Sequence, residues 1–222
     1  MSVSESPSPE AVPIPPGATT GRALERFFAL TDGIVAVAAT LLVLPILDLK
    51  PAPDQTFPEL LQANTGQFWA LLLSFYLVAI LWLAHNRILR GVRAYDGPLF
   101  WLNFLWLLCI VLLPWLSSQF EVGRSGGEVH GNSALLFWLV LAVASLATQR
   151  IAVHLRRNPG LLKPDDQITV PPSGPARHRG YVLSLCFVAI GIANWFSESY
   201  GPWFALLIIP VSLWLKPAQS AD

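Results

Sequence analysis

The sequence predicts an all-α membrane protein that crosses a bilayer six times. Hydrophobic residues make up 54% of its 222 residues and charged residues only 13%, whereas roughly a quarter of the residues of a soluble globular protein are charged. Six segments are free or almost free of charge, and each is close to the ~17–25 residues that a membrane-spanning helix needs. They are 27–47, 67–86, 97–120, 131–149, 180–197 and 199–215.

The first three spans carry polar residues at similar depth. Asp32 lies about six residues into the first span, or ~9 Å at the rise of an α-helix. The second span runs the other way and places Trp82 and His85 near the same end, and the third reaches Asn103 about ~9 Å from its start. Polar groups that face lipid are costly, so these residues and Arg26 are predicted to satisfy one another in a network joining three helices.

Two alternatives stay open for this network. Asp32 is either a structural anchor or a residue on the path of a transported species, and its position supports both readings equally. His85 lies close enough to the membrane surface to face lipid headgroups instead.

The first span also has a stripe at helical spacing, formed by Val37, Thr40, Leu41, Leu44 and Asp48. Around a symmetry axis, such a stripe would form stacked apolar rings that exclude water and so close the pore. A carboxylate ring at the outer mouth would attract cations. Without further information, ordinary helix packing explains the stripe more simply.

The last three spans repeat none of these motifs, so an inverted-repeat transporter is not supported. The fifth and sixth spans are the shortest, and Pro202 and Pro210 interrupt the sixth, which leaves a re-entrant hairpin as an alternative. The segment 150–179 contains five prolines and is predicted to be a cytoplasmic linker. Residues 1–21, rich in Pro and Ser, are expected to be a disordered cytoplasmic tail, followed by the transmembrane domain 22–217 and the tail 218–222.

Basic residues predict the orientation of the chain. Twelve of the 14 Lys and Arg residues lie in the terminal segments and the even-numbered connections. The other side holds only Lys50 and Arg124. Because Lys and Arg stay in cytoplasmic loops, both termini are predicted to be cytoplasmic. The net charge is zero, and nothing in it indicates nucleic-acid binding.

The sequence lacks the motifs that mark several functional classes. It contains no Thr-Val-Gly-Tyr-Gly filter, phosphate-binding glycine loop, His-Glu-x-x-His or Gly-x-Ser-x-Gly. We therefore expect neither an enzyme nor a bound metal, and no catalytic residue is assigned.

Three spans together resemble a known family. Arg26-x-x-x-Leu30-Thr31-Asp32 is similar to the Arg-x-x-x-Phe-Ser-Asp signature that opens the first helix of the transmembrane protein 175 family, the lysosomal potassium channel and its bacterial relatives. Ser74-Phe75 with Trp82-x-x-His85 resembles its second helix. Asn103 with Leu107 and Leu113-Pro114 resembles its third, so that the resemblance covers residues 22 to about 116.

The resemblance implies a bacterial homotetramer in the cell membrane, whose first helices line a potassium-permeable pore without a re-entrant filter. Val37, Leu41 and Leu44 stand at the positions that form hydrophobic constrictions in the family, and all three belong to the stripe, with Thr40 and Asp48 also lining the pore. The resemblance implies that the polar network at the base holds the pore helix; its members are Arg26, Thr31, Asp32, Trp82, His85 and Asn103. Monovalent cations, chiefly K⁺, would be the permeant species, with no cofactor.

The sequence departs from the family pattern at three positions. Leu30 and Thr31 replace the signature Phe and Ser, and Val37 replaces the usual isoleucine of the first constriction. Thr keeps the hydroxyl, so the network should survive, whereas the smaller Val37 leaves the width of the constriction open. Two other functions remain as alternatives: a proton-coupled secondary transporter that uses Asp32 and His85 as a relay, and a membrane scaffold that transports nothing.

Overall fold

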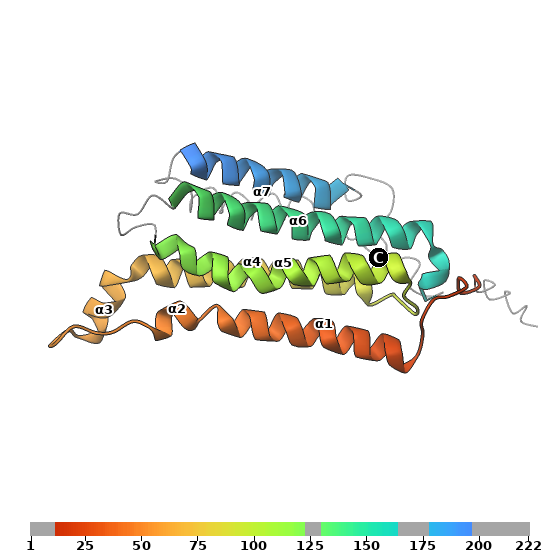
Figure 1. Ribbon diagram of the computed structural model, residues 1–222, viewed down its shortest axis with the longest axis horizontal. Helices are drawn as coiled ribbons and strands as arrows, with labels where there is room; N and C mark the ends of the chain where they lie inside the picture. The colour runs from red at the N-terminus through yellow and green to blue at the C-terminus, as the bar shows by residue number, and fades with distance from the viewer. Residues whose placement is uncertain (1–11, 123–129, 164–177, 197–222) are drawn as a thin grey trace, which may run out of the picture.

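The computed structural model describes residues 12–122, 130–163 and 178–196. Long helices run side by side in this part of the chain (Figure 1). The elements are α1 (Arg22–Leu41), α2 (Leu44–Leu47), α3 (Phe57–Ala63), α4 (Thr65–Leu89), α5 (Gly97–Val122), α6 (His130–Arg157), the 3₁₀ turn η2 (Pro159–Leu161) and α7 (Arg179–Phe196). Strands are absent from the described residues, which contain only two isolated bridges.

Four helical segments are long and apolar enough to cross a membrane: Arg22–Leu47, Thr65–Leu89, Gly97–Gln119 and Ser133–Arg157. They coincide with the first four predicted spans and confirm the prediction of an all-helical, multi-pass membrane protein. The fifth predicted span corresponds to α7, whose apolar part, Gly180–Trp195, is shorter. The sixth, 199–215, lies outside the described residues, so the number of six spans stays a prediction.

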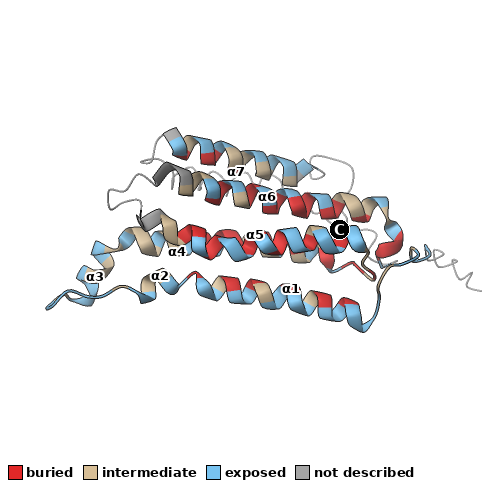
Figure 2. Ribbon diagram, viewed as in Figure 1, coloured by how far each residue is buried: buried red, intermediate tan, exposed pale blue. Residues whose placement is uncertain are grey.

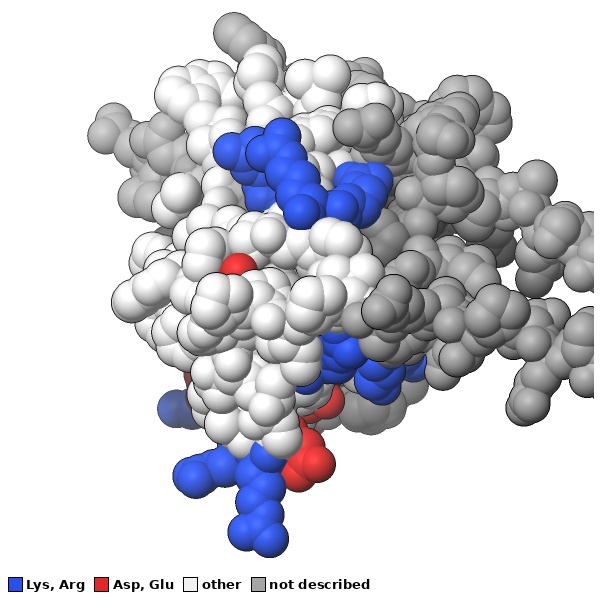
Figure 3. Space-filling view, turned by 90° about the vertical axis from the view of Figure 1, so that its right-hand side faces the viewer, with Lys and Arg blue, Asp and Glu red and all other residues white. Residues whose placement is uncertain are grey.

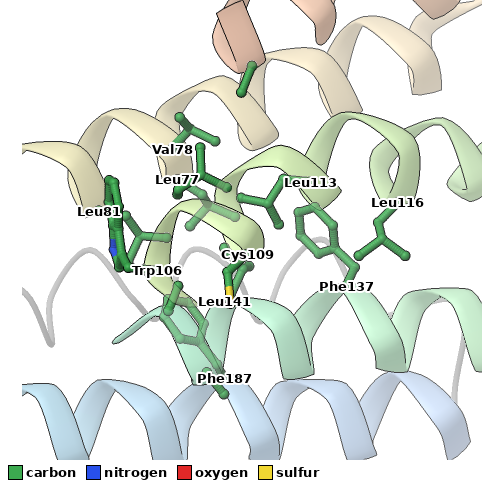
Figure 4. Close-up of a cluster of buried hydrophobic side chains, with 14 of the residues drawn as sticks. Leu77, Val78, Leu81, Trp106, Cys109, Leu113, Leu116, Phe137, Leu141 and Phe187 are labelled. Atoms are coloured by element: carbon green, nitrogen blue, oxygen red, sulfur yellow. The ribbon is translucent and has the colours of Figure 1, made fainter. Parts of the chain in front are cut away.

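Helix α5 is the centre of the bundle, since it packs against α1, α4 and α6, while α7 packs against α6. Its buried face repeats at helical spacing through Trp106, Ile110 and Leu113, none of which is more than 1% exposed. Leu77 and Leu81 of α4 meet this face, as do Phe137 and Leu141 of α6 (Figure 4).

The opposite face of α5 is apolar but exposed (Figure 2). Trp101, Phe104, Leu108 and Trp115 are 48–65% exposed. A soluble protein rarely leaves so continuous an apolar face uncovered. This pattern is expected where lipid or another membrane helix covers the surface.

The first predicted span is not one continuous helix. α1 begins at Arg22 and ends at Leu41, and the chain turns at Leu42 and Val43 before the short α2. Pro45 explains the break, because proline has no N–H for the helix ladder and its ring clashes with the carbonyl four residues earlier.

The end of the bundle that carries the start of α1 is more ordered than the sequence predicted. Backbone bridges join Thr19 to Tyr95 and Val92 to Leu162, and the Arg93 Nε donates to the Gly160 carbonyl at 3.1 Å. Residues 12–21, expected to be disordered, are therefore joined to this end of the bundle through Thr19, although most of them are exposed. We call these three joined segments, 12–20, 91–96 and 158–163, the clasp.

The predicted linker also differs from expectation over its first part. α6 continues to Arg157, and residues 158–163 belong to the clasp. Short backbone pairings of this kind leave no hydrophobic period in the sequence, which explains why the linker prediction missed them. Residues 1–11 and 164–177 of the two predicted segments lie outside the described residues. Lys and Arg side chains gather on this end of the bundle (Figure 3), consistent with the predicted cytoplasmic side.

Candidate functional site

Helix α1 has two distinct faces. Its buried residues are Leu24, Phe27, Thr31, Val35 and Ala38, separated by three or four positions, and they pack toward α5 and α4. This spacing is the apolar stripe that an α-helix buries against a core.

The predicted pore stripe lies on the other face. Val37 is 59% exposed, Leu41 39% and Leu44 49%, and Thr40 and Asp48 are exposed as well. By contrast, the neighbouring Leu42 is 2% exposed. The stripe therefore faces away from the rest of the described chain.

The hydroxyl of Thr40 in the stripe is satisfied within its own helix. The Thr40 hydroxyl donates to the Val37 carbonyl at 2.7 Å, so its proton needs no partner outside the helix. Its oxygen lone pairs remain free to meet a cation or water on the exposed face. Asp48 follows α2 directly and lies beyond the bend.

A buried chain of hydrogen bonds links α1, α4 and α5. The His85 Nε2 lies 2.8 Å from the Asn103 Oδ1, and the Asn103 Nδ2 donates to the Thr31 Oγ1 at 3.0 Å. The Thr31 hydroxyl in turn donates to the Phe27 carbonyl at 2.9 Å. Each of the three side chains is at most 3% exposed.

The direction of these hydrogen bonds determines the tautomer of His85. Since the Asn103 amide nitrogen donates to Thr31, its oxygen is the acceptor that faces His85. The neutral His85 ring therefore carries its proton on Nε2 and has a lone pair on Nδ1. The ring also stacks on Trp106, with centroids 3.8 Å apart and planes at 4°, which fixes its orientation.

A second contact joins α1 and α4 one residue further along. The Trp82 Nε1 donates to the Asp32 Oδ1 at 3.0 Å. Asp32 is exposed in the single subunit. One carboxylate oxygen thus accepts from Trp82, and the other has no hydrogen-bond partner within the described residues.

The structure brings together five of the six residues predicted for the polar network. Thr31, Asn103 and His85 are hydrogen-bonded in series, and Asp32 and Trp82 form a separate pair. The sixth, Arg26, is exposed and forms no hydrogen bond or ion pair within the described residues. Sequence reasoning missed Trp106, which supports the His85 ring. Trp106 lies three residues after Asn103, on the same face of α5, so helical spacing could have identified it.

A family model described as the endosomal/lysosomal potassium channel TMEM175 matches residues 26–114. A protein of Chryseobacterium sp. (strain P1-3) named as a potassium channel is 32% identical over 204 residues, which cover 89% of this chain and 95% of that protein. A Streptomyces collinus protein, also named as a potassium channel, is 28% identical over 76% of this chain and 81% of its own length.

A longer relative and a solved structure agree with these matches. The rat protein named as the endosomal/lysosomal proton channel TMEM175 is 28% identical over 84% of this chain, which spans only 37% of the rat protein. The crystal structure of a lysosomal potassium-selective channel TMEM175 homologue from Chamaesiphon minutus has a TM-score of 0.66 and 19% identity, covering 89% of this chain and all of the other. That likeness shows a shared fold. The named relatives are ion channels, in agreement with the prediction that the chain is not an enzyme.

Proposed function

Because this chain belongs to the TMEM175 family, we propose that it forms a potassium-permeable channel whose pore is lined by α1. The observation that carries the proposal is the exposed stripe of Val37, Leu41 and Leu44. Val37 and Leu41 on the outward face of α1, and Leu44 at the start of α2, are apolar side chains from which a symmetric assembly would build a narrow, non-polar neck. The two bacterial relatives named as potassium channels support K⁺ as the permeant ion.

We infer a homotetramer in the cell membrane, with both termini in the cytoplasm. Four copies of α1 would then surround the axis, and Asp48 would form an acidic ring at the outer mouth that concentrates cations. Along a helix, Val37 and Leu41 are ~6 Å apart, so they would form successive rings. Ions would pass partly dehydrated, and K⁺ sheds its water at a lower cost than Na⁺.

The polar network acts as a support for this pore helix. Thr31 and Asp32 attach α1 to α5 and α4 through Asn103 and Trp82. These contacts fix the rotation of α1 about its own axis, and with it the direction in which the stripe points. The network is therefore proposed as scaffold and not as a selectivity filter.

The proposal is tested with the purified protein in liposomes under a K⁺ gradient and no proton gradient. A cation flux that prefers K⁺ over Na⁺ supports the channel. A flux that needs a proton gradient would instead support a coupled transporter, and the absence of flux from a correctly assembled oligomer would support a scaffold.

Leu41→Asn is the variant that tests the neck. A polar ring at this position should hydrate the pore, raise the flux and weaken the preference for K⁺. Leu42→Asn is the matched control, because its side chain is buried within the subunit and should affect stability more than selectivity. An assembled Leu41→Asn oligomer with unchanged flux and ion preference would place the pore elsewhere.

Proton permeation is a second candidate function, favoured by the name of the rat relative. A direct relay from Asp32 to His85 is not favoured, since the two side chains bond to Trp82 and Asn103 respectively. A pH-sensitive dye inside the same liposomes would measure proton entry. Proton flux that Leu41→Asn changes in parallel with K⁺ flux would assign both ions to one pore.

A further inference from the structure

A cavity of about 240 Å³ lies between α1 and α4, close to the clasp. Asp32, Trp82 and His85 line one end of it, and Arg90 and Lys163 line the other. Arg90 follows Trp82 by eight residues at the end of α4, or ~12 Å along a helix. Lys163 lies at the same level as the end of α4, because its backbone N–H donates to the Gly91 carbonyl at 2.8 Å. The cavity therefore spans the boundary between the apolar helices and the basic end of the bundle.

Asp32 and His85 at the inner end of the cavity each have a hydrogen-bond acceptor without a partner in the described residues. The Asp32 Oδ1 accepts from Trp82, but within the described residues its Oδ2 has no partner. His85 is 1% exposed, and its Nδ1 is buried with no partner in the same part of the chain. Because Nε2 carries the proton of the neutral ring, Nδ1 is an acceptor. A ligand at this end must bring N–H or O–H donors, and a positive charge would complement the carboxylate.

The outer end has the opposite character. Arg90 and Lys163 are both exposed, and neither forms an ion pair among the described residues. Two long cationic side chains at the edge of a membrane helix are suited to bind a phosphate group. An anion alone would fit this end but would be repelled by Asp32 at the other. A small cation alone would fit Asp32 and leave both basic side chains unpaired.

We propose that this cavity binds the headgroup of an aminophospholipid with a primary amine, such as phosphatidylethanolamine. The ammonium group would donate to Asp32 and His85, and the phosphate would accept from Arg90 and Lys163. The flexible stems of Arg90 and Lys163 reach back along the apolar surface toward the phosphate. Exposed apolar side chains of α4, including Phe75, provide surface for acyl chains. Lipid is favoured over a soluble zwitterion because the cavity lies where the apolar helices end.

The test compares lipids that differ in one headgroup feature. The full-length protein is reconstituted in phosphatidylcholine nanodiscs, and phosphatidylethanolamine or phosphatidylglycerol then replaces an equal fraction of the lipid. Phosphatidylcholine has no N–H donor and phosphatidylglycerol has no cation. Phosphatidylethanolamine should raise the midpoint of thermal unfolding by several degrees above its value in phosphatidylcholine alone, and phosphatidylglycerol should not. Native mass spectrometry should detect it as the lipid retained on the protein.

Lys163→Gln and Arg90→Gln test the phosphate end. Each should weaken the apparent affinity for phosphatidylethanolamine about tenfold, as expected for the loss of one charge-assisted hydrogen bond. Arg87→Gln is the matched control, because Arg87 is an exposed base on α4 that does not line the cavity. Both readouts are independent of ion conduction, so the result stands apart from the proposed function.

Three outcomes would overturn the proposal. Equal stabilisation by phosphatidylglycerol would mean that the basic end attracts any anionic lipid. No shift when phosphatidylethanolamine replaces phosphatidylcholine would remove the role of the N–H donors. A full shift from soluble phosphoethanolamine at the same concentration would contradict the lipid source.

Discussion

The buried chain from His85 through Asn103 to Thr31 predicts a specific energetic coupling. Asn103→Leu keeps similar volume but removes the acceptor of the His85 Nε2 proton and the donor to Thr31. A buried donor without a partner costs about 1–3 kcal/mol, and a hydrogen bond between membrane helices contributes about 0.6 kcal/mol on average. The variant should therefore lose about 2–4 kcal/mol of unfolding free energy.

A second substitution separates the missing partner from a packing defect. His85→Phe keeps an aromatic ring against Trp106, which lies 3.8 Å from the His85 ring. In the double variant His85→Phe/Asn103→Leu, no donor is left unsatisfied, so the double variant should be more stable than Asn103→Leu alone. Stability is measured by equilibrium unfolding in mixed micelles with added SDS, followed by circular dichroism.

Ser118→Ala serves as the control for this series. Its hydroxyl donates to the Trp115 carbonyl and accepts from the Gln119 side chain, both within α5, so no contact between helices is lost. Its removal should change stability by less than about 0.5 kcal/mol. The reasoning would be refuted if Asn103→Leu behaved like Ser118→Ala, or if the losses in the double variant were simply additive. Either result would mean that the network does not hold α1 in place.

Two further predictions concern regions outside the proposed pore. Glu59 accepts a hydrogen bond from the Thr56 backbone N–H at 2.8 Å in the capping box of α3, which together with the Thr56 side chain lowers the pKa of Glu59 below 4.5. Because the pKa is depressed in the folded state, the cap is fully formed above about pH 4.5 and is lost as the pH falls through the lowered pKa. Amide hydrogen exchange in α3 should accelerate over the pH range in which the cap is lost. Glu59→Gln should show no such pH dependence. Gly160→Ala should release the N-terminal segment, because a Cβ at this position would lie 2.4 Å from the Pro13 carbonyl oxygen. Limited proteolysis should then cleave near residues 12–19 sooner than in Gly97→Ala, whose Cβ would meet open space, and equal cleavage would mean that the clasp does not depend on this contact.

The depth of the polar groups was predictable from the sequence, and their partners were only partly so. Helical rise alone places Thr31, His85 and Asn103 at one level, and the structure joins them. Arg26 was assigned to the same network, yet it is exposed and bonds to none of these residues within the described part of the chain. Depth is set by position along a helix, whereas contact also requires the right rotation about its axis. Rotation depends on the packing of all neighbouring helices, which the local sequence does not contain.

The bend after Leu41 and the clasp show two different limits of prediction from the sequence. Pro45 was visible in the sequence, and the bend follows from its missing N–H, so a break in the helix within the span 27–47 could have been predicted. The clasp had no such signal. Its bridges, Thr19 to Tyr95 and Val92 to Leu162, pair segments more than 60 residues apart, and only the complete fold brings these segments together.

The two faces of α1 connect the network to the proposed pore. The buried residues from Leu24 to Ala38 recur every three or four positions, so once Thr31 bonds to Asn103 the helix has only one rotation that keeps them buried. In that rotation Val37 and Leu41 must face outward, and their exposures of 59% and 39% against 2% for Leu42 follow from it. Loss of the network would therefore turn the stripe as well as loosen the helix. A network variant that still assembles should consequently show altered K⁺ preference together with lower stability, whereas a variant of the stripe alone should alter preference without lowering stability.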